Sequence, residues 1–459
     1  MTKKRLAALS GTAAFLGLSA ALGLVAQQSD ILIKITKGER PVIAVPDFRA
    51  SGEAQQYMGA FNQTLWDDLE KSGVFRMASK SMYPLRVPQQ PKDFLSPLPS
   101  GTSESSQRGL RMQDWAGPPV NANYMAFGYA AAQGEQLALF GWLYNVNQTT
   151  AQAAQVLGKI YLGGLDEAGA RKVAHEFAAD ILGQFGIKAL LGSKIYFVSD
   201  RTGHKEIWSM DHDGGNQSQL TFFKSISTMP GASPDGSKIA FTTFARGTPQ
   251  ITIFSTASRN RLPFYNQRAS LNAFPSFTPD GNQILYSSTA TGISQIFIAN
   301  TDGSGFRRIS SVRAIEVEPK VNPKNASEIV FVSGRSGVPQ IYRMNIDGAD
   351  VTRLTTGEGH AVNPAWSPDG QHIAFSWTRG YEPGNFNVFV MDVATRQFVQ
   401  LTHGVGRNEN PTWAPDGRHI VFSSNRSGSA QIWTMLADGT QLQRLTSQGR
   451  NEKPVWSAQ

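Results

Sequence analysis

The chain has 459 residues, too many for one compact domain, and two or three domains are expected. Hydrophobic residues make up 40% and charged residues 17%, which excludes a disordered chain and one embedded in a membrane. The net charge is +8 without a dense basic stripe, so no nucleic-acid partner is expected. The sequence contains no cysteine, which excludes disulfides, thiolate metal sites and cysteine nucleophiles.

Residues 1–26 have the pattern of a secretory signal peptide. A basic start at Lys3, Lys4 and Arg5 is followed by an apolar stretch from Leu6 to Val25 that is rich in small residues. An uncleaved membrane anchor is the alternative, because this stretch is just long enough to span a bilayer. We expect cleavage after Ala26 and therefore an exported protein.

Residues 27–40 are expected to form an extended N-terminal segment. Isoleucines alternate with other residues at Ile31, Ile33 and Ile35, which is the pattern of a half-buried strand. Two interpretations remain open. The segment is either a strand of its own domain or an extended epitope that adds to the edge of a partner's sheet.

Residues 41–191 are predicted to form an α/β domain, because strand-like and helix-like stretches alternate. Apolar residues recur at threes and fours over Ala54–Ser72 and Asp166–Leu182, which predicts two amphipathic helices. Pro84–Gln107 is rich in Pro, Ser and Gln and is predicted to be a long loop. The expected strands are Pro41–Val45, Tyr124–Gly128, Leu137–Leu143 and Val156–Leu162, the last two in a hairpin.

Residues 192–459 repeat themselves at intervals of 43 to 47 residues. A proline opens each unit, and in most units a turn of the form Ser/Thr/Ala-Pro-Asp-Gly then leads into an apolar strand. In such a turn Pro fixes φ, Asp bonds the neighbouring backbone and Gly accepts a positive φ. Four short strands in about 45 residues make one blade of a β-propeller. The six prolines are Pro230, Pro275, Pro319, Pro364, Pro411 and Pro454.

The two ends of this region predict how the ring closes. Lys194–Phe197 begins at the second strand of a unit, and Lys453–Ser457 supplies a first strand with no second strand after it. Together they complete one composite blade, which brings the count to six and leaves no open sheet edge. The predicted fold is therefore an α/β N-terminal domain followed by an all-β six-bladed β-propeller closed by a composite blade.

The sequence offers no catalytic motif, since neither a Gly-x-Ser-x-Gly elbow nor a phosphate-binding loop occurs. His175-Glu176 resembles the start of a zinc-binding helix, but Ala179 stands where the second histidine is needed. We expect both residues on the helix surface. Asp211-x-Asp213-Gly214 resembles the start of a calcium loop but falls where every repeat has a blade turn, so we interpret it as a turn. We predict no enzyme, no metal and no cofactor.

The candidate binding site lies where the repeats differ, in the two residues before each proline. We expect these residues to begin the innermost strands and to ring one mouth of the central channel. Mixed polar, acidic and apolar groups on one rim suit recognition of a protein or peptide, although a solvated rim without a partner is the alternative. The predicted protein-binding residues are Met229, Phe274, Val317, Glu318, Asn363, Glu409, Asn410, Glu452 and Lys453, with Ile31, Ile33 and Ile35 of the N-terminal segment.

The combination of these features resembles the TolB family. The resemblance covers the leader, the short N-terminal segment, the stretch Glu39–Phe48 (ERPVIAVPDF), the α/β domain and the six blades. It implies a non-enzymatic periplasmic scaffold of the Tol–Pal system, which links the inner and outer membranes. It also implies a role in outer-membrane integrity and in envelope constriction at cell division.

The resemblance further implies two partners. A Pal-like outer-membrane lipoprotein would bind at the propeller mouth, and a TolA-like inner-membrane protein would contact the N-terminal segment. Glu318 falls where the rim of this family has an acidic residue in the Pal interface. We expect a monomer. The alternative functions are a propeller enzyme and an unrelated envelope adaptor, each with its site in the central channel.

Overall fold

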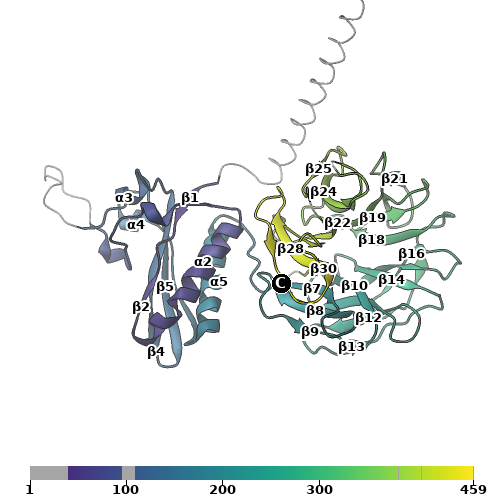
Figure 1. The fold of residues 1–459 in the computed structure, drawn as a ribbon, viewed down its shortest axis with the longest axis horizontal. Helices are drawn as coiled ribbons and strands as arrows, with labels where there is room; N and C mark the ends of the chain where they lie inside the picture. Colours follow the sequence, from purple (N-terminus) through teal and green to yellow (C-terminus); the bar gives the residue numbers. More distant parts are fainter. Residues whose placement is uncertain (1–39, 96–108, 381, 405, 458–459) are drawn as a thin grey trace, which may run out of the picture. The chain divides into compact units, whose positions relative to one another are not determined.

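The computed structural model describes residues 40–95, 109–380, 382–404 and 406–457. The chain forms two compact units, Gly38–Leu191 and Gly192–Gln459 (Figure 1). The predicted signal peptide and the N-terminal segment with Ile31, Ile33 and Ile35 lie outside the described residues. Among the described helices, none combines the length and the apolar character that a membrane crossing requires.

The first unit is built on one mixed sheet. Its strands are β1 Val42–Ala44, β2 Arg49–Ser51, β3 Arg76–Met77, β4 Tyr124–Gln133, β5 Gln136–Asn145 and β6 Gln155–Gly164. Their order is β3-β1-β4-β5-β6, with β2 paired to β4. β1 runs parallel to β3 and β4, whereas β4, β5 and β6 form an antiparallel ladder. Leu137 lies opposite Gly163, which confirms the predicted hairpin.

Two helices cover one face of this sheet, α2 (Met58–Lys71) and α5 (Glu167–Gln184), as Figure 1 shows. Phe61 and Leu65 of α2 and Phe177 of α5 are fully buried in the shared core. The predicted first helix begins as a 3-10 helix, η1 (Gly52–Tyr57). α5 begins after Asp166, whose carboxylate accepts the Gly169 N–H at 2.6 Å and thereby caps the helix.

The opposite face of the sheet packs against the segment that follows β3. This segment contains η2 (Lys80–Met82), η3 (Pro91–Asp93) and α3 (Gln113–Ala116), and α4 (Ala151–Ala154) precedes β6. Phe94 packs edge-on against Phe127 of β4, and Trp115 is fully buried in the same cluster. Residues 84–95, the described part of the predicted loop Pro84–Gln107, are irregular apart from η3 and an isolated bridge at Phe94, as predicted. Buried aromatic contacts order that part despite its Pro- and Gln-rich composition.

The second unit is a six-bladed β-propeller, which confirms the number of blades predicted from the repeats (Figure 1). Each blade is an antiparallel four-stranded sheet with a six-residue inner strand and a short outer strand. The strands are β7 Lys194–Ser199, β8 Glu206–Asp211, β9 Ser218–Gln219, β10 Ser227–Ala232, β11 Lys238–Thr243, β12 Gln250–Ser255, β13 Arg261–Leu262, β14 Asn272–Phe277, β15 Gln283–Ser288, β16 Gln295–Asn300, β17 Arg307–Arg308, β18 Glu316–Val321, β19 Glu328–Ser333, β20 Gln340–Asn345, β21 Thr352–Arg353, β22 Ala361–Trp366, β23 His372–Trp377, β24 Asn387–Asp392, β25 Phe398–Gln400, β26 Asn408–Trp413, β27 His419–Ser424, β28 Gln431–Leu436, β29 Gln443–Arg444 and β30 Asn451–Trp456.

The ring closes through a composite blade of the order β30-β7-β8-β9, as predicted. β30 pairs antiparallel with β7, with Trp456 opposite Ile195. The buried Trp456 indole N–H donates to the Ser193 hydroxyl at 2.9 Å. Strands from the two ends of the propeller sequence thus pair in one sheet. The edges along which β7 and β30 meet are therefore closed by hydrogen bonds.

The six prolines lie in the middle of the inner strands, which begin one residue earlier than predicted from the two residues before each proline. Each inner strand begins three residues before its proline, as at Ser227 for Pro230. The ladder to the second strand shifts register around the proline in all six blades, as between Thr228 and Gly231. Proline has no N–H to donate, and a β-bulge at this point lets the strand continue past it.

Candidate functional site

The inner strands of all six blades line a cavity of about 70 Å³ in the central channel. Prolines and a few other apolar side chains form much of its wall, and Glu318, Lys320 and Lys453 are its charged residues. The residue directly before each proline contributes to the lining. These residues are Met229, Phe274, Glu318, Asn363, Asn410 and Lys453.

All six of these pre-proline residues have a left-handed backbone, with φ between 53° and 58°. Residues other than glycine rarely adopt this conformation, and only asparagine among these six tolerates it readily. Its recurrence at every bulge shows that the fold imposes it irrespective of the side chain. The bulge therefore presents six unlike side chains to the channel from six equivalent backbone positions.

Glu318 is tied to the neighbouring blade. Its carboxylate accepts the backbone N–H of Asn363 at 2.6 Å and the side-chain amide of Asn363 at 3.1 Å. Burial raises the pKa of Glu318, although the charges of Lys453 and Lys320 and the bonds from Asn363 act in the opposite direction.

The two lysines of the cavity have no such partner. Within the described part of the chain, neither the Lys320 nor the Lys453 ammonium forms a hydrogen bond or an ion pair. Burial lowers the pKa of Lys320, and the nearby charge of Glu318 only partly opposes this effect. The cavity thus holds two ammonium groups and one carboxylate, and the carboxylate is already hydrogen-bonded.

Three of the predicted site residues do not line the cavity. Val317 faces Val332 in the ladder between β18 and β19. Glu409 forms an ion pair with Arg407 at 2.9 Å, and Glu452 forms ion pairs with Lys205 and Arg450. These positions come before the bulge, where the strand still pairs regularly, and the structure brings only the second of the two residues before each proline to the cavity.

Sequence reasoning missed the residues two positions beyond the left-handed residue. Lys320, Thr412 and Val455 line the cavity from there. A signal was present, because this position also varies from blade to blade. Its occupants are Gly231, Ser276, Lys320, Ala365, Thr412 and Val455.

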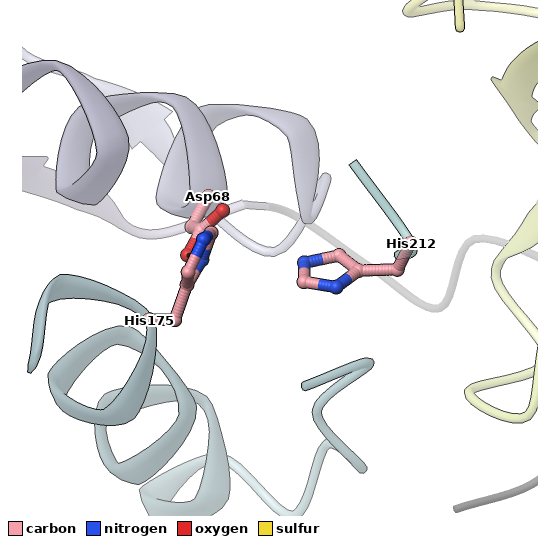
Figure 2. Close-up of side chains that lie close together, drawn as sticks. All are labelled: Asp68, His175 and His212. Atoms are coloured by element: carbon pink, nitrogen blue, oxygen red, sulfur yellow. Dashed lines mark hydrogen bonds and ion pairs between the residues drawn. The ribbon is translucent and has the colours of Figure 1, made fainter. Parts of the chain in front are cut away.

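Two sequence patterns that resemble metal-binding motifs have structural explanations. Asp213 accepts the Gly215 N–H at 2.9 Å, so Asp211-x-Asp213-Gly214 forms the predicted turn after β8. His175 is not on the helix surface, contrary to the prediction, and its Nδ1 lies 2.6 Å from the carboxylate of Asp68 (Figure 2). The two side chains are mostly buried where α5 packs against α2, so their bond links these helices. His212, also drawn in Figure 2, belongs to the other unit.

Comparisons with known proteins agree with this architecture. Residues 184–363 and 356–459 match the family model described as the TolB beta propeller domain. A protein TolB homolog of Chlorobium luteolum is 32% identical over 210 residues, which cover 45% of this chain and 43% of that protein. A Tol-Pal system protein TolB of Cereibacter sphaeroides is 31% identical over 271 residues, 56% of this chain and 55% of that protein. The chain thus spans about half the length of these curated relatives.

The crystal structure of TolB from Acinetobacter baumannii superimposes with a TM-score of 0.72 at 20% identity. The superposition covers 92% of this chain and 98% of that one, and it shows a shared fold. The family model alone matches more than half of the chain. The chain therefore belongs to the TolB β-propeller family.

Proposed function

We propose that this protein is a non-enzymatic periplasmic scaffold of the Tol–Pal system that binds a Pal-like outer-membrane lipoprotein at the mouth of the propeller channel. In this role it supports outer-membrane integrity and constriction at cell division. The observation that carries the proposal is the convergence of six unlike pre-proline side chains on one cavity. The repeats share their scaffold residues, and the side chains that differ are presented together, as recognition requires.

The rim around this cavity supports the proposal. It consists of the residues just before each inner strand and the turns between the second and third strands, which lie at the same end of the blades because neighbouring strands are antiparallel. Ile226 and Ile315, which precede β10 and β18, are 46% and 62% exposed. Ile293 and Val338 of two turns are also exposed. Clustered exposed apolar side chains mark protein-binding surfaces.

Three of the remaining four blades give the rim a different character. The residues that precede β22, β26 and β30 are His360, Arg407 and Arg450, and all three are exposed. The rim therefore has an apolar half and a polar half, in which Arg407 is paired with Glu409 and Arg450 with Glu452. It suits a partner whose surface combines apolar and polar groups. For the N-terminal segment with Ile31, Ile33 and Ile35, we propose contact with a TolA-like inner-membrane protein.

An enzyme with its site in the channel is the second candidate, because the opposed pKa shifts of Glu318 and Lys320 are of a kind common at active sites. The dimensions argue against it. An engineered cavity of about 150 Å³ holds benzene, and small-molecule sites take up roughly 300 Å³ or more. A cavity of about 70 Å³ has room for a single small group.

Calorimetric titration of the full chain with the lipid-free periplasmic domain of the organism's own peptidoglycan-associated lipoprotein tests the proposal. We expect Ile315→Asp to weaken binding by at least about tenfold, because it places a charge in the apolar half of the rim. Ile315 is a sharper target than Glu318, since a change at Glu318 also breaks the contact with Asn363. Leu442, 43% exposed in the turn between β28 and β29 at the opposite end of a blade, provides the control Leu442→Asp. Unchanged binding by Ile315→Asp would overturn the proposal.

A further inference from the structure

The channel cavity has one more positive charge than it can neutralise. Glu318 is its only acidic lining residue, against the two lysines Lys320 and Lys453. The Glu318 carboxylate accepts hydrogen bonds from Asn363 at 2.6 Å and 3.1 Å, whereas neither ammonium group has a bonding partner within the described residues. Both lysines are partly buried. A partly buried charge without a bonded partner is costly, and an added carboxylate would relieve that cost.

Lys320 is an exception within the repeat. At the equivalent position the other five blades have Gly231, Ser276, Ala365, Thr412 and Val455, none of which is charged. The scaffold therefore does not require a lysine there. Its long side chain enters the cavity, whereas Thr412 and Val455, the equivalent residues of two other blades that also line it, are uncharged.

The remaining wall fits a carboxylate on a short apolar stem. Met229, Phe274 and Val455 offer apolar contact, and Asn410 and Thr412 offer hydrogen-bond donors. A cavity of about 70 Å³ accommodates the end of a side chain but not a peptide segment or a sugar.

We propose that the channel cavity is a receptor for one carboxylate, the side chain of an aspartate or glutamate of the protein bound at the rim, held between the ammonium groups of Lys320 and Lys453. The source of the carboxylate rests on the function proposed above, but the chemistry of the cavity does not. Ammonium–carboxylate hydrogen bonds are short and strong when water is excluded, so one inserted acid would anchor the partner and fix its orientation.

Ligand-observed NMR with propionate and propionamide tests the cavity without any partner. These probes have the same shape and differ in charge. We expect the wild-type full chain to bind propionate saturably in the millimolar range and propionamide at least about tenfold more weakly. Equal binding of the two probes would overturn the proposal.

Three substitutions locate the binding. Lys320→Met and Lys453→Met keep the apolar stems and should each weaken propionate binding by at least about tenfold. Lys324→Met removes an exposed lysine at the far end of β18 and should change it by less than about twofold. Thermal melting establishes that each variant is folded. If one of the two cavity variants does not fold, the other still tests the assignment. Wild-type propionate affinity in both folded cavity variants would overturn the assignment.

Short peptides identify the source of the carboxylate. N-acetyl-Gly-Glu-Gly-amide should compete with propionate, whereas N-acetyl-Gly-Gln-Gly-amide should not. If N-acetyl-Gly-Gly-Gly with a free C-terminus binds more tightly than N-acetyl-Gly-Glu-Gly-amide, the proposal that the carboxylate comes from a side chain would be overturned. These results are separable from the proposed function. Propionate binding can persist if Ile315→Asp leaves the lipoprotein bound, and lipoprotein binding can persist if propionate fails to bind.

Discussion

The carboxylate of Glu318 in β18 accepts both the backbone N–H and the side-chain amide of Asn363 in β22, the inner strand of the next blade, at 2.6 Å and 3.1 Å. Both residues precede a proline and both have a left-handed backbone. The bulges at these two positions thus also bring neighbouring blades into direct polar contact. The candidate site and the packing of the ring share residues here.

Replacement of Glu318 by glutamine should stabilise the protein more at neutral pH than at acidic pH. Burial raises the pKa of Glu318, so ionisation costs more in the folded protein than in the unfolded chain. The wild type therefore loses stability relative to Glu318→Gln as the pH rises from the ordinary value of about 4.3 through the raised value. Urea unfolding at about pH 4 and pH 7 measures the difference. The exposed Glu358→Gln is the control, and a Glu318→Gln effect that is the same at both pH values would contradict the prediction.

Closure of the ring should depend on Trp456. The side chain is 7% exposed and its N–H donates to Ser193 at 2.9 Å. Trp456→Ala should lower the free energy of unfolding by about 3–5 kcal/mol, because it empties a large buried site. Ser193→Ala leaves the indole N–H without this partner and should cost about 1–3 kcal/mol. Chemical unfolding measures both values, and a larger loss in Ser193→Ala than in Trp456→Ala would show that packing is not the main contribution.

Gly231 should not tolerate alanine. A Cβ at this position would lie 2.5 Å from the carbonyl oxygen of Pro275 in the next inner strand. Because the obstacle is backbone, we expect Gly231→Ala to lower the free energy of unfolding by about 1–3 kcal/mol. Ser276→Ala is the matched control, since Ala365 already occupies the equivalent position of another blade. Denaturant titration compares both variants with the wild type. If Gly231→Ala were as stable as the wild type, the two blades would be shown to move apart at this point.

Asp369 should stabilise the protein above its folded-state pKa. Burial acts to raise the pKa, but the bonds from His372 and from the Gln371 N–H lower it to about 2. The stabilisation is present above the ordinary value of about 3.9 and is lost as the pH falls from there to about 2. The wild type should therefore be more stable than Asp369→Asn at pH 7, by a margin that shrinks as the pH approaches 3. Unfolding followed over this pH range measures the margin. In His372→Gln, the stabilisation by Asp369 should be lost at a higher pH than in the wild type. A stability difference between the wild type and Asp369→Asn that does not change with pH would contradict the prediction.

The sequence by itself determined the number of blades, the closure of the ring through Lys194–Phe197 and Lys453–Ser457, and the hairpin of the first unit. These features follow from the periodicity of apolar residues and from the alternation of strands and turns, which can be recognised locally in the sequence. The variable residues before the prolines also identified much of the cavity lining, because functional residues interrupt a repeat.

Only the tertiary structure decided which variable residues meet. The bulge turns Glu318 and Lys453 toward the channel, whereas Glu409 and Glu452 pair with neighbouring basic side chains. Lys320 enters the cavity from a position that no motif marks, and His175 finds Asp68 on a helix distant in the sequence. These outcomes depend on backbone conformation and on contacts between blades or helices far apart in the chain. Periodicity specifies the face of a strand or helix, and only the assembled fold specifies what that face meets.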